Sequence, residues 1–142
     1  MSAVKLLNII HYPQICYMDL SEDDIIARCT AGRTLPCGQY AFAVARGSSI
    51  RLARDPIGCN KLFFGLTSEG QLVAGNRAVQ VWRRGVVLGA IGSCPPGHVL
   101  EVSRAGVHDL GGSDVSAIAP DPELSVADFS AGSRAILDQA FR

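Results

Sequence analysis

Cysteine and histidine are the residue types most often used for nucleophilic, redox or metal chemistry, and this 142-residue chain contains eight of them. The five cysteines are Cys16, Cys29, Cys37, Cys59 and Cys94. Their number is odd and none forms a CxxC pair, so neither a redox motif nor a zinc knuckle is expected. The histidines, His11, His98 and His108, are too scattered to indicate a metal site. The sequence therefore predicts no metal ligands, reduced thiols, and cysteines that mostly fill the core.

A short acidic run could also hold a substrate. Residues 21–24 read Ser-Glu-Asp-Asp, and apolar residues at helical spacing follow before Gly32. A serine followed three residues later by an aspartate resembles a capping box, and acidic residues favour the first turn of a helix. Gly32 suits a helix C-terminus. The pattern predicts a helix over 21–31, and a helix cap is the simplest explanation of these carboxylates.

Arg54 and Asp55 form the second candidate, at the start of the sequence RDPIG, which ends at Gly58. Proline presets its own φ, glycine permits a positive φ, and aspartate accepts hydrogen bonds from the following backbone, so residues 55–58 are predicted to form a tight turn. A second rigid turn is predicted at Pro96 and Gly97. We interpret both turns as structural or interface features rather than as a catalytic acid.

The remaining pattern indicates many short strands joined by turns. Predicted strands lie at 4–10, 38–46, 50–54, 61–67, 71–74, 98–103 and 107–110, with a helical turn over 76–84. The composition of 111–124 is typical of a linker, and 125–142 has helical spacing, with Val126, Phe129, Ile136, Leu137 and Phe141 on one face. The predicted organisation is a domain at 1–110, a linker at 111–124 and a helix at 125–142. Hairpins with short helices suit a layered α+β fold with antiparallel sheets.

Composition argues against several classes of partner. Hydrophobic residues make up 48% of the chain, charged residues 18%, and the formal net charge is zero. No charged field favours nucleic acid or an anionic membrane, and Trp82 beside Arg83 and Arg84 is too small a basis for a nucleic-acid site. No segment reaches the roughly 20 apolar residues that span a bilayer, and no phosphate-binding loop is present. A cytoplasmic protein is expected.

Five segments, in order, resemble one family. Residues 38–44 (GQYAFAV) are similar to a strand written dGxFAFA, and 52–58 (LARDPIG) to a turn written LARDxxG. Residues 60–65 (NKLFFG) are similar to xKPLYYG, 70–74 (GQLVA) to GxLxFASE, and 95–98 (PPGH) to PPGH. The ordered set resembles the glutamine amidotransferase domain of asparagine-synthetase-like enzymes, whose relatives include β-lactam synthetases and lasso-peptide cyclases. The resemblance covers about residues 21–110 and is more specific than any single segment.

The resemblance implies a partial αββα sandwich of the N-terminal-nucleophile type, with the start of the domain absent. The family's glutaminase uses an N-terminal cysteine, whose thiolate attacks the glutamine amide while its own α-amine acts as base. This chain begins Met1-Ser2, and nothing in it resembles the family's RGPD or NGEIYN segments, which bind substrate and stabilise the oxyanion. Ser2 could become N-terminal, but without those segments no catalytic residue is predicted.

The resemblance also bears on ligands and partners. Glu22 or Asp23 falls where the family's SDxE segment holds the glutamine amino group, which makes these two residues a possible remnant of a substrate site. The predicted helix at 125–142 resembles the start of the family's synthetase domain. ATP and Mg²⁺ would belong to the rest of that domain, whose SGGxDS motif the chain lacks, so no cofactor is expected here. The expected partner is a synthetase domain or protein, and a homo-oligomer is also compatible. Two alternatives are a fragment of a genuine glutamine-hydrolysing asparagine synthetase and a stand-alone interaction domain.

Overall fold

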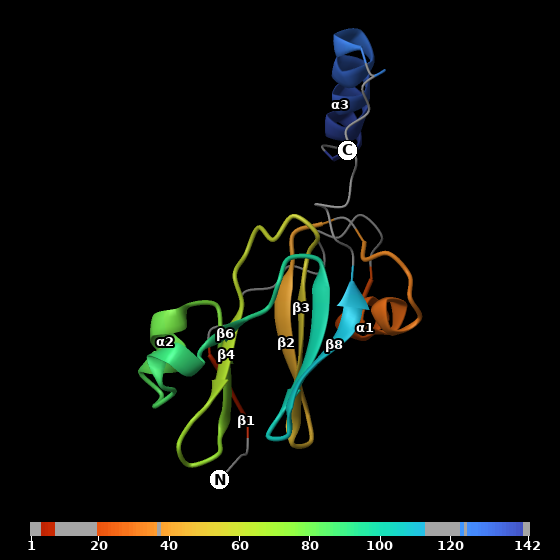
Figure 1. The fold of residues 1–142 in the computed structure, drawn as a ribbon. Helices are drawn as coiled ribbons and strands as arrows, with labels where there is room; N and C mark the ends of the chain where they lie inside the picture. Colours follow the sequence, from red (N-terminus) through yellow and green to blue (C-terminus); the bar gives the residue numbers. More distant parts are fainter. Residues whose placement is uncertain (1–3, 8–19, 37, 113–122, 124, 141–142) are drawn as a thin grey trace.

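A computed structural model describes residues 4–7, 20–36, 38–112, 123 and 125–140 (Figure 1). They form a mixed α+β fold with two four-stranded sheets and helices. The predictions that concern Ser2, Cys16, Cys37, strand residues 8–10 and most of the linker lie outside the described residues. Within the described part, no helix has the length and apolar character needed to cross a membrane.

One sheet is antiparallel throughout and has the strand order β2-β3-β7-β8. Its strands are β2 (Ala41–Arg46), β3 (Ser49–Arg54), β7 (His98–Ser103) and β8 (Gly106–Gly112). The strand predicted to begin at residue 38 begins at Ala41, because the backbone of Tyr40 is hydrogen-bonded to Asp55. β8 is longer than predicted and takes the first two residues of the predicted linker.

The other sheet has the strand order β1-β5-β4-β6. Its strands are β1 (Val4–Leu7), β5 (Leu72–Gly75), β4 (Phe63–Leu66) and β6 (Gly92–Ser93). β4 and β5 form the predicted hairpin, with shorter strands than expected. β1 is the exception to the predicted antiparallel pairing, since it runs parallel to β5. β6 was not predicted, because two residues are too few to show the alternation that identifies a strand.

The main core joins apolar side chains from both sheets. Strand alternation explains how, because successive side chains point to opposite faces. In β3, Ile50 and Leu52 belong to this core, whereas Ala53 belongs to a second cluster under a helix. The members contributed to the main core by the β1 sheet and its connections include Val4, Leu62, Phe64, Leu72, Ala74 and Cys94. Each sheet therefore packs one face against the other sheet.

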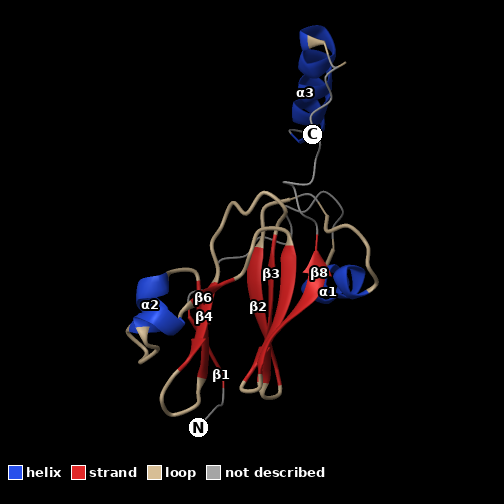
Figure 2. Ribbon diagram, in the orientation of Figure 1, coloured by secondary structure: helices blue, strands red, loops and turns tan. Residues whose placement is uncertain are grey.

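A helix lies on the outer side of each sheet (Figure 2). α1 (Glu22–Thr30) buries Ile25, Ile26 and Cys29 in a cluster that contains Phe42 and Val99 of the β2 sheet. α2 (Ala78–Trp82) buries Val81 with Val73 of β5 and Val86. A 3₁₀ turn, η2 (Leu88–Ala90), follows α2. The predicted helices at 21–31 and 76–84 are confirmed in shortened form.

The last helix, α3 (Val126–Ala140), stands clear of both sheets in Figure 1. Its described side chains are exposed, apart from the half-buried Ser133. Ser125 accepts a hydrogen bond from the backbone of Asp128, so the helix is capped like α1. The predicted helix is confirmed, and Val126, Ile136 and Leu137 of its apolar face are in solvent.

Candidate functional site

Two turns from the family-like segments meet at one end of the β2 sheet. Arg54 ends β3, Asp55 to Gly58 form the first turn, and Pro96 and Gly97 form the second turn, directly before β7. The carbonyl of Asp55 accepts hydrogen bonds from the backbone N–H groups of Gly58 at 3.0 Å and Gly97 at 2.9 Å. We call Arg54, Asp55, Gly58, Pro96 and Gly97 the Arg-Asp corner. Five of the residues singled out from the sequence are therefore neighbours.

The guanidinium of Arg54 is buried and donates to three backbone carbonyls on two segments. Nε donates to Asn60 at 2.7 Å, Nη1 to Cys94 at 2.5 Å and Nη2 to Gly58 at 3.0 Å. A buried charge is tolerated only where hydrogen bonds replace its hydration. The planar guanidinium can reach several carbonyls at once, which a lysine ammonium could not do in the same geometry. Arg54 thus ties the first turn to the segment that precedes the second.

The carboxylate of Asp55 is fully buried and accepts from backbone N–H groups. Oδ1 accepts from Gly58 at 2.6 Å and from Cys59 at 3.3 Å, while Oδ2 accepts from Tyr40 at 3.3 Å. Asp55 and Arg54 therefore bind main-chain groups of opposite polarity. This arrangement fixes loops, and its charged groups are occupied by backbone partners rather than directed at an open pocket.

Gly58 cannot carry a side chain in this position. Its φ is +72°, and an added Cβ would lie 2.8 Å from both Arg54 Nη2 and Pro96 Cγ. Both the left-handed backbone and the close approach of the second turn require glycine. At the tip of the same turn, Ile57 is 78% exposed. The corner is thus rigid at its base and presents an apolar side chain to solvent.

The two buried cysteines, Cys29 and Cys94, lack the surroundings of a nucleophile. Burial raises the pKa of the Cys94 thiol to about 12, and burial together with the nearby Asp109 carboxylate raises the pKa of Cys29. A thiol that stays protonated at neutral pH is a poor nucleophile. Cys59 is exposed. The prediction that most cysteines fill the core agrees with two of the three described ones, Cys29 and Cys94, and Cys59 follows a surface turn.

The possible substrate remnant, Glu22 and Asp23, lies away from the corner, in the first turn of α1. Ser21 and Asp24 form the predicted capping box: the Ser21 hydroxyl accepts from Asp24 N at 3.2 Å, and Asp24 accepts from Ser21 N at 3.0 Å. The hydrogen bonds from Ser21 lower the pKa of Asp24. Asp23 pairs with Arg46, which ends β2 opposite the end that meets Arg54.

A shallow pocket of about 530 Å³ opens beside this ion pair. It is lined by Asp23, Ile26, Ala27, Thr30, Ala31 and Arg51. Arg51 is already paired with Glu101 at 3.3 Å, and Glu101 also accepts from the Ser49 hydroxyl at 3.2 Å. The pocket offers a carboxylate and a guanidinium at its edge, both engaged in ion pairs on the outer face of the sheet.

Sequence reasoning missed a pair between His98 and Asp109. His98 Nδ1 lies 2.8 Å from Asp109 Oδ2, across the β7–β8 hairpin. The backbone N–H of His98 donates to the carbonyl of Pro95 at 3.4 Å. The pairing could not be read from the hairpin because the register shifts between His98 and Leu100. Such an irregularity leaves little sequence signal.

Among the residues that the structure describes, no three or more His, Cys, Asp or Glu side chains gather in a way that could hold a metal ion. The candidate site is therefore the Arg-Asp corner, a junction of two turns with an exposed tip. The sequence matches no protein-family model, and it matches no curated protein.

Proposed function

We propose that this chain is a degenerate or incomplete glutamine amidotransferase-like domain of an asparagine-synthetase-type ligase, with a structural rather than a glutaminase role. The complete system would activate a carboxylate with ATP and join it to an amine or to ammonia. The part played by this chain would be to pack against a synthetase domain or protein. By itself it would neither hydrolyse glutamine nor bind ATP.

The observation that carries the proposal is the junction between the two family-like turns. The LARDPIG and PPGH segments were recognised separately, yet Gly97 donates to the Asp55 carbonyl and Arg54 donates to the Cys94 carbonyl. The strands beside the two turns are paired, with Ala53 of β3 opposite Val99 of β7, and these hydrogen bonds join the turns at the end of that pair. The two family-like turns thus form one structural feature, which agrees with a packing role better than with catalysis.

The order of layers also supports the proposal. α1 lies outside the β2 sheet, α2 lies outside the β1 sheet, and the main core lies between the sheets. This helix–sheet–sheet–helix order is the one expected of the αββα family, although fold alone does not determine function. The pKa of Cys94 and the backbone-bound Asp55 carboxylate offer no substitute for the missing nucleophile and base.

The exposed tip of the corner suggests where a synthetase could bind. Ile57 projects beyond a turn that Arg54 and Gly58 hold rigid, and a rigid apolar side chain loses little conformational entropy on binding. An interface there would explain why so many hydrogen bonds support a surface turn.

The test combines activity with binding. Ammonia release from glutamine is measured for the purified chain, alone and with a purified asparagine-synthetase-type synthetase protein, and binding of that protein is measured by calorimetry. We expect no ammonia from the chain alone, and weaker binding by Ile57→Asp than by Val107→Asp, a matched control on β8 that is 52% exposed. Glutamine hydrolysis that disappears in Ser2→Ala would make the chain a serine-dependent glutaminase and overturn the proposal.

Two alternative functions predict different observations. Coding sequence for Met-Cys-Gly upstream and for SGGxDS downstream would identify a fragment of a genuine glutamine-hydrolysing asparagine synthetase. A stand-alone interaction domain is favoured by a second exposed apolar surface, on and after α2. Binding of no synthetase by the chain would support that reading.

A further inference from the structure

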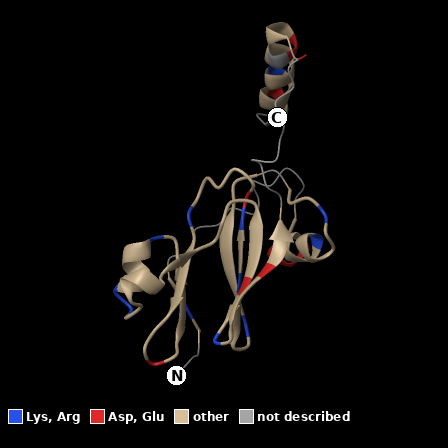
Figure 3. Cartoon of the chain, in the orientation of Figure 1, with Lys and Arg blue, Asp and Glu red and all other residues tan. Residues whose placement is uncertain are grey.

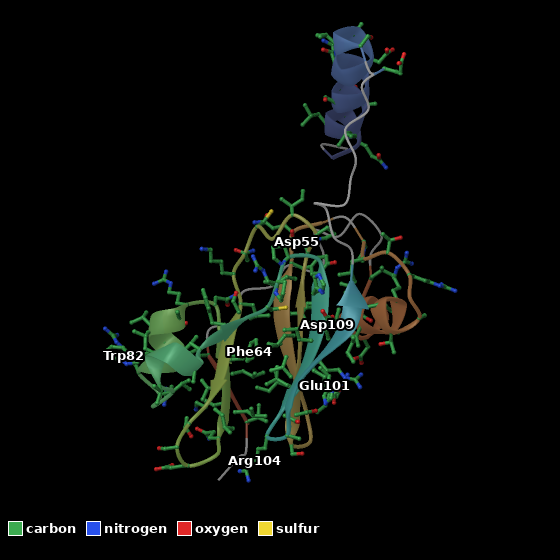
Figure 4. The ribbon with its side chains drawn as sticks, viewed as in Figure 1. Asp55, Phe64, Trp82, Glu101, Arg104 and Asp109 are labelled. Carbon is green, nitrogen blue, oxygen red and sulfur yellow. The ribbon has the colours of Figure 1, made fainter. Side chains whose placement is uncertain are left out.

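The outer side of α2 exposes large apolar side chains together with arginines. Val79 is 44% exposed, Trp82 52%, Val87 71% and Leu88 70%. We call these four residues, with Arg83 and Arg84, the α2 surface. Figure 4 shows Trp82 on the side of α2 that faces away from the sheets. Contiguous exposed apolar residues mark interaction sites in soluble proteins, and tryptophan and arginine are the residues most enriched where binding energy concentrates.

The charge around this surface has one sign. Residues 70–100 contain three arginines and no acidic residue, and Figure 3 colours the charged positions that flank α2 as basic. Residues 113–142 show the opposite balance, with five acidic residues against two arginines. A neutral chain thus carries net charges of +3 and −3 on two separate segments. Complementary charges of this kind favour association of the two segments.

The acidic segment contains α3, whose described apolar side chains are exposed. Val126 is 83% exposed, Ile136 68% and Leu137 56%. A helix of 15 residues is only marginally stable alone in water, and most helical stability comes from packing an apolar face. The α2 surface is apolar, positively charged and exposed, and α3 has an exposed apolar face and carries two aspartates against one arginine.

We infer that α3 of one copy packs on the α2 surface of a second copy, so that two chains exchange their last helices in a symmetric dimer. Because α3 stands clear of its own body, its apolar face is open to another molecule (Figure 1). Reciprocal exchange forms the same contact twice and closes the assembly at two copies. The inference does not depend on the proposed amidotransferase role, since it uses neither the corner nor the family-like segments.

Sedimentation equilibrium of the full 142-residue chain tests the inference. We expect a monomer–dimer equilibrium that weakens as salt is added, because screening reduces the attraction between the charged segments. Removing a central apolar anchor, in Trp82→Ser or Ile136→Ser, should weaken dimerisation about 30-fold or more. Val107→Ser removes an apolar side chain of similar exposure on β8 and should leave the dimer unchanged. Circular dichroism checks that each variant is folded.

A charge exchange separates direct contact from a loss of folding. Reversal of the α2 arginines in R83E/R84E should weaken the dimer, and Asp138→Arg on α3 should restore part of the loss only in that background. A monomer at every concentration would overturn the inference, whether α3 amides are protected from hydrogen exchange by intramolecular packing or exchange freely. A dimer that resists both Trp82→Ser and Ile136→Ser would overturn it as well.

Discussion

Two regions of this molecule use the same pair of side chains, an arginine and an aspartate, in opposite ways. In the Arg-Asp corner, Arg54 and Asp55 are buried and each binds the backbone, so that two turns are held by charge-assisted hydrogen bonds. At the start of α1, Asp23 pairs with Arg46 while both side chains remain largely in solvent, at 71% and 45% exposed. The comparison teaches that burial and hydrogen bonds to the backbone, rather than the pairing of opposite charges, determine how much such residues contribute to the stability of the fold.

The largest difference between the two regions should appear when each aspartate is removed. Asp55→Ala leaves the buried N–H group of Tyr40 and the partly buried N–H groups of Gly58 and Cys59 without the carboxylate, and we expect a loss of about 3 kcal/mol in the free energy of unfolding. Urea denaturation followed by circular dichroism measures it. Asp55→Asn keeps one acceptor oxygen and should lose less. If Asp55→Ala and Asp23→Ala cost the same, the distinction between the regions is wrong.

A glycine comparison isolates the close approach of the two turns. Gly58→Ala must adopt a left-handed backbone and also displace Arg54 and Pro96, with an expected loss of about 2–3 kcal/mol. Gly47→Ala has a similar φ of +59° but no atom within 4 Å of the added Cβ, so only the backbone cost of about 1 kcal/mol is expected. Thermal and urea unfolding of the two variants give the difference. Equal losses would mean that the second turn can move away.

Alkaline pH should weaken the corner through Cys94, whose carbonyl accepts from Arg54. Its thiol pKa is raised from 9.0 to about 12, so between these values the folded chain holds a proton that the unfolded chain releases. Stability from this group is intact below pH 9 and falls as pH rises toward 12, by at most about 1.4 kcal/mol per pH unit. Unfolding measured at pH 8 and pH 10 should show the fall, and Cys94→Ala should reduce it. An unchanged slope in that variant would contradict the assignment to Cys94.

The smallest effect is expected at the exposed pair. Asp23→Ala or Arg46→Ala should change the free energy of unfolding by about 1 kcal/mol or less, because solvent and salt screen the pair. The double variant gives the coupling energy, which should shrink further at high salt. A coupling that persists at high salt would show that this pair resembles the corner after all.

The local elements could be predicted because their signals are local. The capping box of Ser21 and Asp24, the turn of Asp55 to Gly58 and the hairpin of β4 and β5 each depend on residues a few positions apart. The predicted boundaries were less accurate where tertiary contacts decide them, as at Tyr40, whose backbone turns to Asp55 instead of continuing β2. Of the candidate site, the sequence indicated every residue of the corner but not that its two turns touch.

By itself, the sequence determined which residues form turns, which cap helices and which alternate between the faces of a strand. These signals indicated the α+β class and the members of the Arg-Asp corner. Only the tertiary structure decided that β1 pairs with β5, that Asp109 meets His98, and that Arg54 reaches Cys94 across 40 residues of sequence. The physical reason is that turns and caps are fixed by neighbouring residues. Strand pairing and buried hydrogen bonds depend instead on which distant segments meet when the apolar faces of both sheets leave water.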